Sequence, residues 1–267
     1  MQEIYRGLTS KLKCTVGAQR EVHYEIAGSD GMVLQDLLGK QLKIEVTGVK
    51  ACVACGKALK KTFQQGYCFP CTQRLAVTDM CQMKPETCHF ALGTCRDSHY
   101  AEKQCMIAHT VYLARTSAVK VGVTREYQEE TRWMDQGAVE ALPIARAFSR
   151  RDAGLLEVAI AQEMTDKTHW RAMLKNEVVE ADLLELRAQV WERIQHLSHW
   201  QRREEVPRRF SFPVLRYPSK VKSVNLDKQP SFQGCLTGIK GQYLMFDAEF
   251  VCNIRKYSGY EISWSVE

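Results

Sequence analysis

The sequence predicts an α+β protein in which a cysteine-rich metal-binding region and a ββαβα module are flanked by N- and C-terminal β segments that form a small barrel or sandwich. Three observations predict this class. Eight of the 11 cysteines lie between residues 52 and 105, a strand–strand–helix–strand–helix pattern follows them, and apolar residues alternate with polar ones near both ends. A length of 267 residues allows one large domain or two to three small ones.

Composition narrows the class of protein further. Hydrophobic residues make up 45% and charged residues 25% of the chain, which is typical of a globular protein. No apolar run reaches the roughly 18 residues of a membrane-spanning helix, so no membrane partner is expected. The first residues lack the basic and apolar regions of a secretory signal, which predicts a cytoplasmic protein. A formal charge of +6 is compatible with a polyanionic partner but too small to establish one.

Four regions are expected: an N-terminal β segment, a cysteine-rich zinc-binding region, an α/β module with a long helix, and a C-terminal β segment, at residues 1–50, 51–107, 108–205 and 206–267. Apolar and polar residues alternate strictly along 22–26, 42–47 and 260–266. A period of two is the pattern of half-buried strands. Because each end alone offers a thin core, the two end segments are expected to pair with one another. Two independent small sheets are the alternative.

The first cysteine group has the spacing of a structural zinc site. Two CxxC pairs, Cys52 with Cys55 and Cys68 with Cys71, are separated by twelve residues. Each CxxC turn places two sulfurs on one side, and two such turns facing each other close a tetrahedral thiolate site. Four protein ligands leave no open coordination position, so this zinc is expected to hold structure. The alternatives are free core cysteines and a redox pair.

The second cysteine group has no CxxC pair. A second four-cysteine metal site is expected here, with zinc as the first choice and an iron–sulfur cluster as the lesser option, from Cys81, Cys88, Cys95 and Cys105. The spacing does not match the runs found in ferredoxins. Some of these cysteines are, in the alternative reading, small buried apolar residues.

Two basic segments are candidates for contact with DNA or RNA. Residues 50–75 contain no acid, and their candidate phosphate contacts are Lys57, Lys60 and Lys61. Neutralisation of the anionic thiolate cluster explains these lysines equally well. Residues 202–228 carry eight basic and three acidic residues interleaved with aromatic ones, and the candidate contacts are Arg208, Arg209, Lys220 and Lys222. Prolines in this segment equally favour an extended linker.

The module that follows the cysteines is predicted element by element. Its hairpin, short helix and third strand are expected at 110–114 with 119–124, at 127–136 and at 141–148. Pro143 favours an edge position for the third strand. Asp152 is a candidate N-cap for the next helix, which carries Glu157. A long amphipathic helix is then expected over 178–200.

This module resembles the GIY-YIG nuclease superfamily, the fold of certain homing endonucleases and of the incision subunit of bacterial nucleotide-excision repair. Residues 111–113 correspond to its first motif and residues 120–122 to its second. The helix arginine of the family falls on Arg132 and its metal-binding glutamate on Glu157. Lys120 replaces the tyrosine of the second motif, as it also does in phage-type branches of the superfamily, and this departure puts the usual mechanism in doubt.

The resemblance implies a role for each of four residues, which we call the quartet: Tyr112, Lys120, Arg132 and Glu157. Glu157 would hold Mg²⁺ or Mn²⁺, and Arg132 would clamp phosphate oxygens. Tyr112 would orient or deprotonate the attacking water, and Lys120 would supply a second positive charge or lower the pKa of Tyr112. Taken singly, each residue is better explained as an ordinary strand or helix residue, and only the set, taken in order on the expected elements, favours the fold.

The whole chain also resembles an uncharacterised bacterial family of about this length. The motifs that carry this resemblance lie at residues 65–71, 84–88, 93–95, 120–125, 131–137, 225–228 and 238–247. The expected function is therefore a zinc-containing nucleic-acid-binding protein with a metal-dependent phosphodiesterase site, working in a larger nucleic-acid-processing assembly. The alternative is a non-catalytic nucleic-acid-binding or protein-interaction adaptor on the same fold.

Overall fold

The computed structural model describes residues 1–29, 31–162, 164 and 169–267. Its larger sheet has seven strands, which in spatial order are β1 (Gln2–Leu8), β14 (Tyr260–Val266), β4 (Gln41–Lys50), β11 (Ser231–Lys240), β12 (Tyr243–Phe246), β13 (Phe250–Asn253) and β10 (Lys222–Ser223). The predicted pairing of the two end segments is confirmed, because β4 lies between β14 and β11. The prediction of a barrel is wrong, because within the described residues the sheet stays open, with β1 and β10 at its edges.

A two-stranded hairpin, β2 (Lys13–Val16) with β3 (Val22–Glu25), shares a core with the larger sheet. Tyr24 of the hairpin and Ile44 and Trp264 of the sheet are buried in this core. The short 3-10 helix η1 (Leu34–Leu37) follows the hairpin and buries two leucines. The alternating patterns at 22–26, 42–47 and 260–266 thus mark strands that each bury one face.

The smaller sheet has the order β6 (Val119–Arg125), β5 (His109–Arg115), β7 (Glu140–Ala147) and β8 (Trp200–Arg202), with β9 (Arg208–Arg209) also paired to β7. Helix α3 (Glu129–Asp135), preceded by η6 (Glu126–Gln128), covers one face, where Tyr112 packs with Trp133. Helices α4 (Arg150–Ala161) and α6 (Leu183–Ile194) cover the other face, where Leu113 packs with Leu156. The predicted order of two strands, helix, strand and helix is confirmed.

Three local predictions in this module are corrected. Strand β7 is interior rather than at an edge, because it pairs with β5 on one side and with β8 and β9 on the other. Pro143 lies between the β7 residues that pair with β9 and those that pair with β8. The strand needs no N–H donor at that position. Ser149 rather than Asp152 caps α4, since the Ser149 hydroxyl accepts a hydrogen bond from the Asp152 amide at 3.1 Å. Helix α6 has only 12 residues, because the residues before Asp182 do not form helix.

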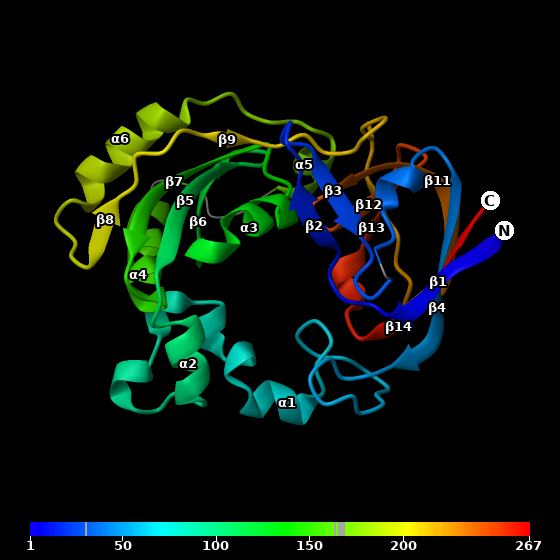
Figure 1. The fold of residues 1–267 in the computed structure, drawn as a ribbon, viewed down its shortest axis with the longest axis horizontal. Helices are drawn as coiled ribbons and strands as arrows, with labels where there is room; N and C mark the ends of the chain where they lie inside the picture. Colours follow the sequence, from blue (N-terminus) through cyan, green and yellow to red (C-terminus); the bar gives the residue numbers. More distant parts are fainter. Residues whose placement is uncertain (30, 163, 165–168) are drawn as a thin grey trace.

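The cysteine-rich segment connects β4 to β5 and lies beneath both sheets (Figure 1). It consists of α1 (Phe69–Arg74), α2 (Ser98–Gln104) and the 3-10 helices η2 (Ala76–Thr78), η3 (Met80–Gln82), η4 (Pro85–Thr87) and η5 (Phe90–Leu92). Its start is tied to the larger sheet by the Ala51 amide, which donates to the Gly259 carbonyl at 2.8 Å. Its middle packs on α4, where a Cβ added to Gly154 would lie 2.5 Å from the Glu86 amide nitrogen.

The end of α3 fixes the two sheets relative to one another. The buried Asp135 carboxylate accepts hydrogen bonds from Lys11 at 2.7 Å and from the Gln242 amide at 2.8 Å. Gln242 also bonds both the amide and the carbonyl of Leu12. Helix α5 (Trp170–Leu174) and η7 (Ile254–Tyr257) complete the described elements. Among the described residues, no helix has both the length and the apolar composition needed to cross a bilayer.

Candidate functional site

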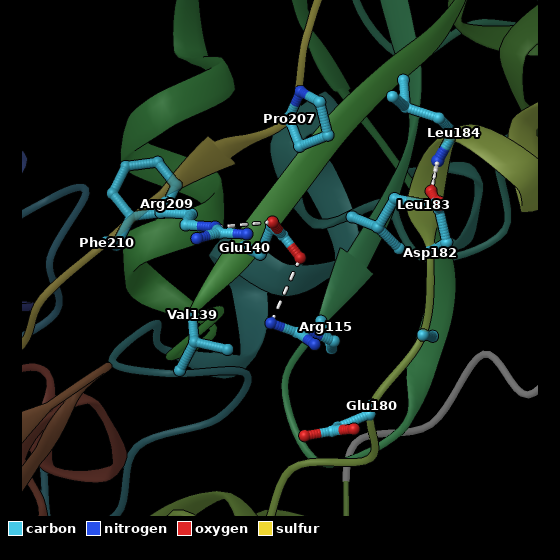
Figure 2. Close-up of a pocket in the computed structure, with 11 residues that line it drawn as sticks. Arg115, Val139, Glu140, Glu180, Asp182, Leu183, Leu184, Pro207, Arg209 and Phe210 are labelled. Carbon is cyan, nitrogen blue, oxygen red and sulfur yellow. Dashed lines mark hydrogen bonds and ion pairs between the residues drawn. The ribbon is translucent and has the colours of Figure 1, made fainter.

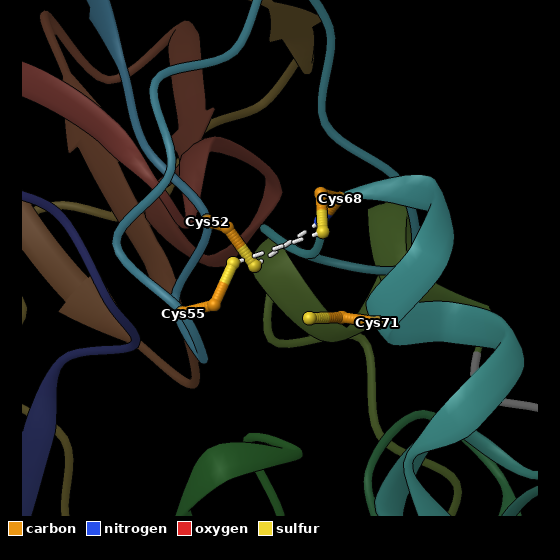
Figure 3. Close-up of side chains that lie close together, drawn as sticks. All are labelled: Cys52, Cys55, Cys68 and Cys71. Atoms are coloured by element: carbon orange, nitrogen blue, oxygen red, sulfur yellow. Dashed lines mark hydrogen bonds between the residues drawn. The ribbon is translucent and has the colours of Figure 1, made fainter.

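The first cysteine group converges as its spacing predicts (Figure 3). The sulfurs of Cys52, Cys55, Cys68 and Cys71 all lie within 4.8 Å of one another. The Cys55 and Cys68 sulfurs are 3.9 Å apart. Tetrahedral zinc with bonds of about 2.3 Å requires sulfurs roughly 3.8 Å apart. The group is therefore compatible with a metal site such as zinc, which would be structural because all four positions are filled by protein.

The local structure around these sulfurs favours binding of a cation. Burial acts to raise the pKa of Cys52, but hydrogen bonds from the Cys55, Cys68 and Ala54 amides outweigh it and lower the pKa to about 6. The Cys68 amide lies 3.2 Å from the Cys52 sulfur. The CxxC turns thus stabilise a thiolate before any metal binds.

The second cysteine group is arranged differently. No three of the sulfurs of Cys81, Cys88, Cys95 and Cys105 lie within 4.8 Å of one another in the described structure. Cys81 instead lies within that distance of Asp79 and His89. Asp79 is already ion-paired with Arg96 at 2.7 Å. Burial, followed by the nearby charges of Asp79 and of Cys88 and Cys105, raises the pKa of Cys81 to about 11. The second metal site stays a prediction, and an iron–sulfur cluster has no support.

The quartet is built around the Tyr112 hydroxyl. Tyr112 is fully buried on β5 and lies opposite Gly122 of β6. A Cβ added to Gly122 would lie 2.6 Å from the Tyr112 hydroxyl oxygen, so the glycine of the second motif is required for this ring to fit. The Gln136 side-chain amide donates to the same hydroxyl at 2.9 Å. Lys120 is 8% exposed and, two residues from Gly122, shares its strand face.

Two further members of the quartet act on the same hydroxyl. Burial raises the pKa of Tyr112, the charge and hydrogen bonding of Arg132 lower it, and the charge of Glu157 raises it. Arg132 acts from α3, which packs on the same face of the sheet as Tyr112, whereas Glu157 acts from α4, which covers the opposite face. Arg132 is exposed and Glu157 is half-buried, so both are accessible to a solvent-borne ligand. The charges of Arg132 and Glu157 thus both influence the ionisation of Tyr112.

One charged residue near this point was not found by sequence reasoning. Arg255, in η7 of the larger sheet, is partly buried, and burial together with the charge of Arg132 lowers its pKa. Its Nε donates to the Gln65 side chain at 2.8 Å. In the described part of the chain neither arginine forms an ion pair with a carboxylate. The Asp135 carboxylate is near enough to raise the pKa of Arg255 and so balances part of this positive charge. The two guanidinium groups together still favour an anion such as phosphate. No local pattern could have paired residues so distant in sequence.

The seven predicted nucleic-acid contacts divide into two classes. Three already pair with carboxylates: Arg208 with Glu130, Arg209 with Glu140, and Lys222 with Glu249. Lys57, Lys60 and Lys61 are exposed and form no ion pair within the described residues. Lys220 lines a cavity of about 390 Å³ beside Arg216 and Tyr217. The lysines of the first cysteine region are therefore the better candidates for phosphate contact.

A cavity of about 1100 Å³ is lined by residues that include no member of the quartet (Figure 2). Glu140 on its wall pairs with Arg115 at 3.2 Å and with Arg209 at 2.9 Å. Asp182 on the opposite wall caps α6 by accepting from the Leu184 amide at 2.8 Å. Because these polar groups satisfy one another, the cavity offers no evident site for a charged ligand.

The chain belongs to a family of proteins of unknown function, DUF2797, whose model matches residues 39–262. This span includes both cysteine groups and all four members of the quartet. No curated protein matches the chain. No solved structure matches it either. The family therefore relates most of the chain to other proteins without assigning it an activity.

Proposed function

We propose that this protein binds DNA or RNA and cleaves phosphodiester bonds at the quartet with the help of Mg²⁺ or Mn²⁺, in the manner of the GIY-YIG nucleases that residues 108–161 resemble. The observation that supports this most is that the charges of Arg132 and Glu157, on separate helices, both influence the ionisation of the Tyr112 hydroxyl. Side chains placed in this way by three different elements are what a phosphodiesterase site requires.

The chemistry assigns a role to each side chain. Since burial is the largest influence on Tyr112 and keeps its pKa above the ordinary value, the hydroxyl stays protonated at neutral pH and orients the attacking water rather than deprotonating it. The Arg132 fork and Lys120 neutralise charge on the phosphate. The Glu157 carboxylate is the hard ligand that a divalent cation prefers, and the cation would stabilise the charge that develops on the phosphate oxygens.

The remaining regions support the same function. The zinc-compatible group holds a basic loop in place, and Arg255 extends the cationic surface from Arg132 towards that loop. All 11 cysteines are free thiols, which supports a reducing, cytoplasmic location. We infer that the protein works within a larger nucleic-acid-processing assembly.

Cleavage of labelled DNA and RNA in Mg²⁺ or Mn²⁺ tests the proposal. Glu157→Gln and Arg132→Ala should each reduce cleavage at least a hundredfold, because each removes transition-state stabilisation of about 3 kcal/mol or more. The matched controls are Glu192→Gln and Arg151→Ala, which alter exposed residues outside the quartet. Absence of cleavage by the zinc-loaded wild type with either metal would reject the enzyme.

A non-catalytic nucleic-acid-binding adaptor is the second candidate. The observation that favours it is the complete burial of Tyr112, whose hydroxyl is already bonded to Gln136. This alternative predicts oligonucleotide binding that weakens with salt but no metal-dependent cleavage.

A further inference from the structure

The first cysteine group presents an uncovered pair of aromatic rings, one in the loop between the two CxxC turns and one inside the second turn. Phe63 is 37% exposed and Phe69, at the start of α1, is 56% exposed. Their ring centroids are 5.6 Å apart, with an edge-on angle of 61°. Single exposed apolar residues are ordinary on a protein surface, but two large rings in contact form a platform. We call these two residues the aromatic platform.

The segment that carries the aromatic platform is basic. The Lys61 ammonium lies 5.4 Å from the centre of the Phe63 ring. Lys57 and Lys60 are exposed on the same loop, and no acidic residue occurs in the sequence from 50 to 75. An apolar surface on a basic segment matches a polyanion that also carries flat, apolar faces.

The platform is held rigidly. Phe63 and Tyr67 exchange two backbone hydrogen bonds of 2.8 Å. Between them Gln64 and Gln65 have left-handed φ values of 40° and 64°, which non-glycine residues adopt at a cost. The Arg255 side chain holds Gln65 at 2.8 Å. A strained turn fixed by a distant arginine places the platform next to the cationic surface that leads to Arg132.

We propose that the aromatic platform binds single-stranded nucleic acid, with unpaired bases stacked on Phe63 and Phe69 and neighbouring phosphates held by Lys57, Lys60 and Lys61. Single strands are favoured over duplexes because paired bases already stack on one another and expose only their edges. This inference rests on the nucleic-acid-binding half of the proposed function and is independent of cleavage. It names the substrate class: DNA or RNA with an unpaired segment near the quartet.

Fluorescence anisotropy with a short labelled oligonucleotide tests the inference, using full-length protein of measured zinc content. The probes are one mixed sequence as single-stranded DNA, as single-stranded RNA, as duplex and as an abasic single strand. Phe69→Ala should weaken single-strand binding about tenfold and leave binding to the abasic strand unchanged. Phe69→Trp should bind as the wild type does. The matched control is Phe148→Ala, since Phe148 is 45% exposed and, like Phe63, lies under a basic side chain.

A second variant covers the case in which Phe69→Ala loses zinc. Lys61→Gln leaves the cysteines and the ring in place and should lower the salt dependence of single-strand binding by about one released counterion. The inference is overturned if Phe69→Ala and Lys61→Gln both retain wild-type affinity and salt dependence, or if duplex binds as tightly as single strand. Binding that depends on Phe69 without cleavage would reject the nuclease and keep this inference. Cleavage of single strands that Phe69→Ala does not affect would keep the nuclease and reject this inference.

Discussion

The two cysteine groups contain four residues each, yet the fold treats them differently. The first brings all four sulfurs within 4.8 Å, with Cys52 held by backbone amides. In the second, Cys81 lies with Asp79 and His89, and Asp79 is bound to Arg96. The first group is encoded by two local turns, whereas the second depends on how separate 3-10 helices dock on α4. The spacing of cysteines within one turn therefore predicts how close their sulfurs lie, whereas the spacing between separate turns does not.

The largest expected effect is loss of metal from the first group. Cys68→Ser should abolish zinc binding by this group and unfold residues 51–75, because a structural zinc contributes about 10 kcal/mol or more to the folding of small sites. Metal analysis and hydrogen exchange of the loop measure both effects. Cys88→Ser is the matched variant in the second group and should leave the loop at 51–75 protected. Equal loss of zinc in the two variants would contradict the difference drawn between the groups.

The second prediction concerns the loss of folding stability in acid. His109 follows the second group, and burial lowers its pKa to about 4 from an ordinary 6.5, although the Ile107 carbonyl partly opposes this. The folded protein keeps the imidazole neutral, so its contribution to stability is complete above pH 6.5 and is lost as the pH falls towards 4. The full effect is about 3 kcal/mol.

His109→Gln removes this titration. Urea unfolding at pH 7 and pH 5 should show a smaller loss of stability in the variant than in the wild type. Comparing the two proteins cancels the acid sensitivity of the zinc thiolates, which they share. An identical pH dependence of both proteins would show that His109 is not held neutral.

The smallest expected effect concerns the packing that holds the second group. Gly154→Ala adds a Cβ 2.5 Å from the Glu86 amide nitrogen and should destabilise the protein by about 1–3 kcal/mol. Ala153→Gly, one residue earlier in α4, removes a buried methyl without adding volume and serves as the comparison. If only Gly154→Ala increases proteolysis of residues 76–105, the second group is held by packing on α4. No change in that proteolysis would argue for another anchor, including a metal.

The sequence predicts much of this fold because its signals are local. Strict alternation located β3, β4 and β14, and the CxxC pairs located the first cysteine group. One prediction failed where a distant partner decides the outcome: Pro143 fits an interior strand because β8 and β9 leave a gap opposite it. Another failed locally, since Ser149 caps α4 although Asp152 fits the same role by pattern. Arg132 on α3 influences Arg255 in η7, a relation between distant segments that no spacing reveals.

The quartet is an intermediate case. Tyr112, Arg132 and Glu157 lie on the strand and helices predicted for them, and the charges of the arginine and the glutamate both influence the ionisation of the tyrosine. Sequence gave no hint that Tyr112 would be fully buried beneath Gln136. Burial of this kind changes the chemistry, because it favours a hydroxyl that orients water over one that removes a proton.

Diffraction from crystals soaked in Mn²⁺ is the decisive test of a divalent-cation site at the quartet. Anomalous scattering distinguishes manganese from the zinc expected at the first cysteine group. We expect a manganese peak bonded to the Glu157 carboxylate, at about 2.2 Å, on the side that faces Arg132, and its loss in Glu157→Gln. A peak only elsewhere, for example at the acidic wall of the large cavity, or a Glu157 carboxylate turned away from Arg132, would contradict it.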